Sequence, residues 1–248
     1  MDSESSVRSV TPEGLNYLQM VQALSEECCT VTDERVFEIE LVTRLLDNFG
    51  TLLSLLDRLA SCYWGCQKGD HIIESLVGRC CSSSFSSLIL IRHGYYDEAL
   101  ALARSVDEIA NLLTLFASDQ SSLYEWKARD KKARKKEFSP FNVRIKLEEL
   151  NVPTPIGQEI YGYLSERATH VTPNTRPQVH NEDLKSMVGG VYQEPGARIC
   201  LNHIALALGV AANAVVELIP IDQERREDIE HATHRLLASI FEKEPGEF

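Results

Sequence analysis

Apolar residues recur every three or four positions through most of this chain, which is the spacing of one face of an α-helix. The longest such run lies between Asp33 and Trp64, where Thr32 is a candidate N-cap and Gly65 follows the run. Its spacing is heptad-like, as in helices that pack along one another over many turns. We therefore predict one long helix from Asp33 to Trp64, with apolar positions at Val36, Ile39, Val42, Leu46, Phe49, Leu53, Leu56 and Leu59.

A second well-defined helix is expected between Gly94 and Phe116. One stripe of this helix is apolar along its whole length. Arg104, Glu108 and Asn111 lie together on the opposite side, but two leucines share that side with them. A helix that is apolar on two sides is usually central in its bundle, so we predict a central position for it. The stripe consists of Ala99, Leu102, Val106, Ile109, Leu113 and Phe116.

The same pattern predicts an all-α protein, a helical bundle of about eight helices with one long irregular segment. Residues 1–12 are expected to form a disordered tail, and residues 13–248 one helical domain. Within this domain, residues 171–198 are expected to be a long loop or flap, because they are rich in proline and glycine. Residues 188–192 could form a small ribbon. The other expected helices are Glu13–Glu27, His71–Ile91, Ser122–Glu137, Val143–Leu150, Gly157–Thr169, Ile199–Leu218 and Gln223–Phe241.

Composition narrows the class of protein. The net charge of −12 argues against general affinity for nucleic acid or for an anionic membrane. The first residues are polar and acidic, unlike a signal peptide, and no apolar run approaches the roughly 20 residues that span a bilayer. Seven cysteines without a Cys-x-x-Cys motif favour reduced, mostly buried thiols. We expect a cytoplasmic protein without a membrane segment.

Motifs for bound cofactors are missing from the sequence. It contains no G-x-G-x-x-G, no Walker loop, no H-E-x-x-H and no Glu-x-x-His pair, so we predict no cofactor. Cys62, Cys66 and His71 could be imagined as zinc ligands, but their spacing differs from that of common structural sites, and packed thiols are the favoured interpretation. A solvated helix face is likewise favoured over a metal site at Glu227, His231 and His234. The sequence thus predicts no metal.

One segment, residues 127–136, is strongly basic in this otherwise acidic chain. Clustered cations can contact phosphates through counterion release, which makes the segment a candidate for binding RNA. The alternative is an exposed helix that only increases solubility. The candidate nucleic-acid contacts are Lys131, Lys132, Arg134, Lys135 and Lys136.

Three residues form a candidate catalytic group. Arg104 and Glu108 stand four residues apart, either as an ordinary ion pair on a wet helix face or as an internal pair lining a cleft. His170 lies where a helix is expected to end, and it could simply stabilise that helix end. If the helix face turns toward His170, the three side chains supply an acid, a base and a cation for general acid–base catalysis.

The segments around these residues support a comparison with other proteins. The segment from Gly94 to Ala99, with Glu98, is followed by Arg104-Ser105 and Glu108. Trp126 with its basic run comes next, and Tyr161 or Tyr163, with Leu164 and Ser165, precedes His170. This order resembles an uncharacterised family of bacterial helical proteins over roughly residues 70 to 175. It is also distantly similar to the higher-eukaryote-and-prokaryote nucleotide-binding superfamily of helical domains. Many members of that superfamily are ribonucleases in toxin and phage-defence systems, and their signature has four to six residues between an Arg and a His.

Two classes of function follow. The first is an interaction or regulatory module, expected to be a homodimer through the helix Asp33–Trp64. The second is a metal-independent ribonuclease of the toxin or phage-defence type, which uses a His, an Arg and a Glu to promote attack by a ribose 2′-hydroxyl. Arg198 with His203, and Arg225 or Arg226 with His231, fit the spacing of the superfamily signature. Such matches arise easily in a chain with this many arginines and histidines.

Overall fold

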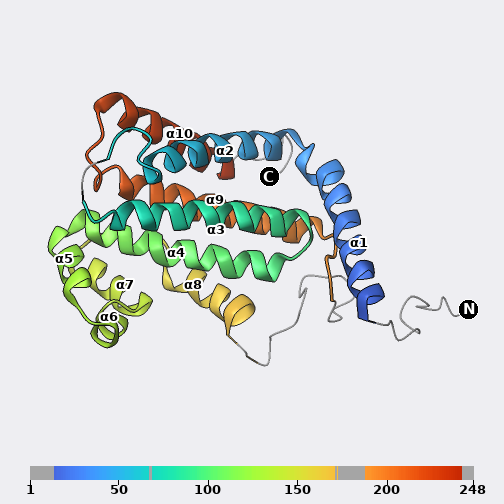
Figure 1. Ribbon diagram of the computed structural model, residues 1–248, viewed down its shortest axis with the longest axis horizontal. Coiled ribbons are helices and arrows are strands. Elements are labelled where there is room, and N and C mark those ends of the chain that lie inside the picture. The colour runs from blue at the N-terminus through green and yellow to red at the C-terminus, as the bar shows by residue number, and fades with distance from the viewer. Residues whose placement is uncertain (1–13, 67–68, 171, 173–187, 242–248) are drawn as a thin grey trace, which may run out of the picture.

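The computed structural model describes residues 14–66, 69–170, 172 and 188–241, and this part of the chain is helical without a β-strand (Figure 1). The predicted all-α class is confirmed, with ten α-helices in the described residues where the pattern predicted about eight. The helices are α1 (Gly14–Thr32), α2 (Glu40–Ala60), α3 (Ile72–Arg92), α4 (Tyr96–Ser118), α5 (Gln120–Ala128), α6 (Lys131–Glu137), α7 (Pro140–Glu149), α8 (Gln158–Leu164), α9 (Glu194–Val215) and α10 (Gln223–Phe241); π-helical turns extend α1 (η2, Asp33–Phe37) and α8 (η3, Ser165–Thr169).

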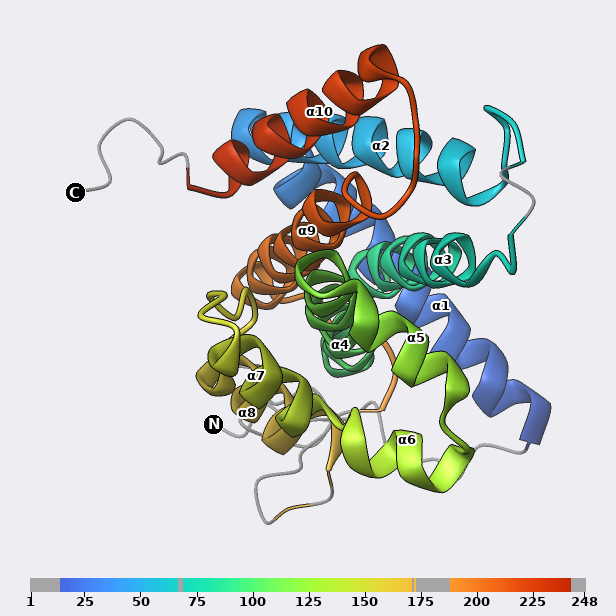
Figure 2. The same ribbon diagram turned by 90° about the vertical axis from the view of Figure 1, so that its left-hand side faces the viewer.

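Five helices form the main bundle. Helix α4 packs against α3 and α9, and α10 packs against α2 and α9. The short helices α7 and α8 lie on the other side of α4 (Figure 2). Helix α4 is therefore covered on opposite sides, which confirms its predicted central position. Its buried residues include Leu100 and Leu115, the two leucines of the side that carries Arg104.

Helix α9 is the most apolar element of the core. By length and composition it could cross a membrane, although the sequence pattern predicted no segment of that kind. Within the fold, 61% of its most apolar window is buried among the other helices. That burial is the pattern of a core helix in a soluble protein, with small residues such as Ala205, Gly209 and Ala212 on its packed faces.

The predicted long helix from Asp33 to Trp64 is divided in two. Thr32 has helical backbone angles and no capping hydrogen bond, so α1 continues through it into η2. The chain then breaks at Ile39, whose backbone is extended, and α2 begins at Glu40. The apolar face of α2 is buried against α10 and α3 within the same chain. Packing inside the chain thus accounts for the heptad-like run, and the homodimer stays a prediction that this run no longer supports.

Two other expected elements also differ from the structure. The predicted helix Ser122–Glu137 is two helices, because the side chain of Asp130 accepts a hydrogen bond from the amide of Ala133 at 2.8 Å and starts a new helix there. The expected irregular segment 171–198 ends earlier, since α9 begins at Glu194 with a proline in its first turn. Residues 188–193 are irregular and form no ribbon. The expected tail 1–12 and most of the expected flap lie outside the described residues.

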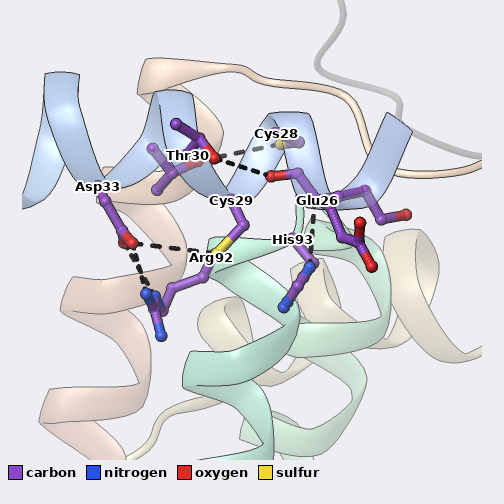
Figure 3. A network of polar contacts seen from close by, with 9 residues as sticks. Glu26, Cys28, Cys29, Thr30, Asp33, Arg92 and His93 are labelled. Atoms are coloured by element: carbon purple, nitrogen blue, oxygen red, sulfur yellow. Dashed lines mark hydrogen bonds and ion pairs between the residues drawn. The ribbon is translucent and has the colours of Figure 1, made fainter. Parts of the chain in front are cut away.

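Helix α1 stands at one end of the bundle and is attached near its C-terminus (Figures 1 and 3). Arg92, at the end of α3, forms an ion pair with Asp33 of η2, with Nε 2.9 Å from Oδ1. His93 Nδ1 lies 3.1 Å from the carbonyl oxygen of Ser25, and the Ser25 hydroxyl lies 2.6 Å from that of Tyr95. These contacts fix the second half of α1 to the turn between α3 and α4.

A crossing of two backbone segments completes this junction. Gly94 has a φ of +77°, a left-handed conformation that suits glycine. Its carbonyl oxygen accepts a hydrogen bond from the amide of Val191 at 3.5 Å. A Cβ atom on Gly190 would lie 2.0 Å from the carbonyl oxygen of His93, so only glycine fits there. The segment that leads into α9 is thereby held against the α3–α4 turn.

Candidate functional site

A polar group on α4 joins that helix to α8. The Tyr161 hydroxyl donates to Glu108 Oε1 at 3.0 Å and accepts a hydrogen bond from Arg104 Nη2, while Arg104 and Glu108 form an ion pair at 3.2 Å. The Arg104 side chain is only 11% exposed, and that of Glu108 is 38% exposed. The Arg104–Glu108 pair predicted from the sequence is therefore partly buried, and it connects α4 to α8 through Tyr161. The sequence pattern did not identify Tyr161 as a partner of this pair.

A second arginine faces the same tyrosine. The guanidinium carbons of Arg104 and Arg144 each lie 4.6 Å from the centroid of the Tyr161 ring, within cation–π range. Arg144 comes from α7, is buried, and donates to the side chain of Gln158. Burial lowers the pKa of Arg144, and the nearby Tyr161 and Glu108 oppose that shift. Arg104 Nε and Arg144 Nη1 are buried without a hydrogen-bond partner among the described residues.

Two further polar residues of α4 bind neighbouring segments. The Asn111 amide donates to the Ile156 carbonyl at 2.9 Å and accepts from the Ile156 amide at 3.1 Å, which fixes the chain just before α8. Asp107 is fully buried, and one of its carboxylate oxygens lies 2.9 Å from His203 Nε2 on α9. Burial raises the pKa of Asp107, and the hydrogen bond from His203 partly opposes this. Arg198 and His203 fit the Arg–His spacing of the superfamily signature, but they have different partners here. His203 contacts Asp107, whereas Arg198 pairs with Glu194.

His170 directly follows η3, and its amide donates to the Ser165 carbonyl at 2.8 Å. The residue is exposed. Because η3 packs against α4, His170 stands one residue beyond a segment that touches the helix of Arg104 and Glu108. The convergence of these three side chains in one pocket stays a prediction.

The basic residues of α6 differ in their exposure to solvent. Lys131, Lys132, Lys135 and Lys136 are exposed on α6. Arg134 instead turns inward, with its guanidinium 5.0 Å from the centroid of the Trp126 ring. Four of the five candidate RNA contacts therefore face solvent, and Arg134 has a packing role.

Helix α1 carries an exposed apolar face that the sequence analysis did not single out. Leu15 and Leu18 are 77% and 63% exposed. Beside them lies an open groove of about 550 Å³, lined by Leu18 and Val21 on one side and by Tyr95 and Val188 on the other. Helical spacing alone does not reveal such a face, because a buried and an exposed apolar stripe have the same period.

Cysteine and histidine residues gather at one place in the described part of the chain. Cys62, Cys66 and His71, between α2 and α3, offer ligand atoms that all lie within 4.8 Å of one another. Cys66 is exposed and Cys62 is partly exposed, unlike the packed thiols that the sequence favoured. His231 and His234, in contrast, are exposed on α10 and belong to no such group of described residues.

No family model, curated protein or solved structure matches this chain. The resemblance to a bacterial helical family and to the nucleotide-binding superfamily therefore stays a prediction, and function is argued from the geometry alone.

Proposed function

We propose that this protein is an interaction module that binds an amphipathic, basic α-helix of a partner protein on the exposed face of α1. The observation that carries the proposal is the pair of exposed leucines, Leu15 and Leu18, beside a mostly apolar groove. Contiguous exposed apolar surface is costly in a soluble protein, and it often marks a binding site. A groove beside a helix suits a partner that presents leucines at helical spacing.

Charge favours a basic partner over a second copy of the chain. Helix α1 contains no Lys or Arg, and its exposed Glu26 and Glu27 directly follow Ser25, which also lines the groove. Past the end of α1, Glu34 and Glu38 are also exposed, with one exposed cation, Arg35, between them. Two copies of α1 would bring like charges together, whereas a basic helix would gain electrostatic attraction as well as apolar burial.

Leu18→Asp is expected to weaken binding of a designed amphipathic peptide by about ten- to a hundredfold. The reason is that burial of one leucine contributes roughly 1.5 to 3 kcal/mol, and 1.4 kcal/mol is a factor of ten in affinity. The peptide carries leucines on one face and lysines at its flanks, and its binding is measured by fluorescence anisotropy. The double variant Glu26→Gln/Glu27→Gln is expected to weaken binding at low salt and to reduce its salt dependence.

Two controls accompany this experiment. A scrambled peptide of equal composition tests for attraction by charge alone, and it is expected to bind weakly. Phe141→Asp changes an equally exposed apolar residue on α7, 62% exposed, and is expected to leave binding unchanged. Equal binding of both peptides would refute the proposal. So would a wild-type dimer that Leu18→Asp dissociates in analytical ultracentrifugation, because the occupant would then be a second copy.

A second candidate function is metal-independent cleavage of RNA. The observation that favours it is the pair of guanidinium groups around Tyr161 with unused buried donors, next to a carboxylate that is partly exposed. Cleavage by the ribose 2′-hydroxyl needs a base, an acid and stabilisation of phosphate charge. Arg104, Glu108 and His170 are our candidates for these roles, with the α6 lysines as contacts to the phosphate backbone.

Replacing Lys131, Lys132, Lys135 and Lys136 with Gln is expected to weaken RNA binding if this second function holds. The salt dependence should flatten by about one unit of slope for each lost phosphate contact. The fold should survive, because these four side chains are exposed. His170→Ala, in contrast, should abolish cleavage and leave binding nearly intact. Absence of RNA affinity at low salt, or unchanged cleavage by His170→Ala, would rule this function out.

A further inference from the structure

The loop between α2 and α3 brings together three side chains whose chemistry suits a thiophilic metal ion. Cys62 Sγ lies 3.6 Å from His71 Nδ1, and Cys66 Sγ lies 3.4 Å from His71 Nε2. In tetrahedral zinc, bonds of about 2.3 Å to sulfur and about 2.0 Å to nitrogen place the two ligand atoms about 3.6 Å apart. The two sulfur atoms approach different nitrogens of the His71 ring, and one ligand atom from each of the three residues lies within 4.8 Å of the others. A small rearrangement of the side chains would bring both sulfurs to this distance from a single ring nitrogen.

The backbone of this loop is held in an unusual conformation. Among the described residues, three other than glycine have a positive φ, and two of them are Cys62 at +56° and His71 at +52°. A left-handed conformation costs of order 1–2 kcal/mol for such residues, and it persists where the surroundings over-determine it. In this loop both residues with positive φ have side chains that contact the Cys–His group, on a spacing of three and four intervening residues that is uncommon for zinc sites.

A carboxylate next to the histidine completes the arrangement. Glu74 Oε1, on the first turn of α3, lies 3.5 Å from His71 Nδ1, and its side chain is 14% exposed. Histidines that bind metal through one ring nitrogen commonly donate the other N–H to a carboxylate, which orients the ring. His71 can therefore bind an ion through Nε2 while Nδ1–H donates to Glu74. A cavity of about 140 Å³ lined by Cys62 and Glu74 opens beside the group and offers space for a fourth ligand from solvent.

We propose that Cys62, Cys66 and His71 bind one Zn²⁺ ion, with Glu74 positioning His71. The two thiolates neutralise the charge of the ion, so the site adds no net charge to the loop. Its ligands come from one connection between two core helices, and the bound ion would fix the end of α2 relative to the start of α3. The site lies far along the chain from α1 and is independent of the proposed function.

The test is metal binding by the full-length reduced protein. After incubation with Zn²⁺ and removal of excess, the wild type is expected to retain one equivalent per chain by elemental analysis. Co²⁺ is expected to give the intense visible absorption of a tetrahedral site and a thiolate charge-transfer band. Cys62→Ser, Cys66→Ser and His71→Asn should each lose the ion, and Glu74→Gln should bind it about 10- to 100-fold more weakly.

Cys29→Ser is the matched control, since Cys29 is a partly exposed thiol outside the group, and it should retain the full equivalent. Circular dichroism confirms that each variant is folded before its metal content is compared. The proposal is overturned if the reduced wild type retains no zinc, or if His71→Asn retains as much as the wild type. Equal loss in Cys29→Ser would also overturn it, because binding would then be adventitious thiol chemistry.

Discussion

Asp107→Ala is expected to lower the free energy of unfolding by about 3 kcal/mol. The Asp107 carboxylate is fully buried, and His203 is 14% exposed. Removal of the carboxylate leaves the imidazole of His203 in the core without its acceptor, and it leaves a small cavity between α4 and α9. Removing one partner of a buried polar pair lowers the free energy of unfolding by much more than the intact pair contributes to it. Chemical denaturation followed by circular dichroism measures the change.

Asp107→Asn separates the hydrogen bond from the charge. The asparagine oxygen can still accept from His203 Nε2, and the amide avoids the desolvation that raises the pKa of Asp107. We expect this variant to lose less than half of the stability that Asp107→Ala loses. The double variant Asp107→Ala/His203→Ala should be destabilised by less than the sum of its single variants, because neither partner remains to be orphaned. Strict additivity would show that the two side chains act independently.

Gly190→Ala is expected to destabilise the protein by about 3 kcal/mol as well. Its Cβ would meet the His93 carbonyl oxygen at 2.0 Å and the Ser25 Cα at 3.1 Å. Both are backbone atoms, so no side-chain rotation can relieve the overlap, and overpacking of this kind typically costs 1–3 kcal/mol. Separation of the two segments would also weaken the attachment of α1. The same denaturation experiment measures this loss.

Gly50→Ala is the control for Gly190→Ala. Gly50 lies within α2, and its Cβ would meet nothing within 4 Å. Alanine forms helices better than glycine by up to about 1 kcal/mol, so this variant should be slightly more stable than the wild type. If the Gly190→Ala protein were as stable as the wild type, the two backbone segments could move apart without a loss of free energy of unfolding.

Capping residues and periodicity predicted some helix ends correctly and others wrongly. The helix Gln223–Phe241 was predicted with both ends correct, and Asp222 accepts a hydrogen bond from the amide of Arg225 at its start. The break at Ile39 could not be predicted, because Val36 and Ile39 continue the apolar spacing across it while the backbone becomes extended. Asp130 is an N-cap residue that could have predicted a separate helix in the basic segment. The run of positive charges was instead interpreted as one continuous helix.

The candidate sites show the same limit in another form. Arg104 and Glu108 were found because they share one helix face, and Tyr161 was missed as their partner because it arrives from a different helix. Cys62, Cys66 and His71 could be named together from the sequence, but packed thiols were favoured because the spacing does not reveal the positive φ angles of Cys62 and His71. Residues that share one helix face can thus be identified from a single segment of sequence. A site formed by several segments can be identified only when the tertiary contacts are known.

The central place of α9 has a consequence for synthesis on the ribosome. Helix α4, complete at Ser118, has its main packing partner in α9, which ends only at Val215. At translation rates of roughly 5–20 residues per second, the apolar face of α4 waits on the order of 5 to 20 s for that partner. During this interval α3 and α4 can pair, but their shared groove stays open to water. The nascent chain therefore exposes this apolar face of α4 until α9 emerges, and we expect it to need protection from aggregation during that interval.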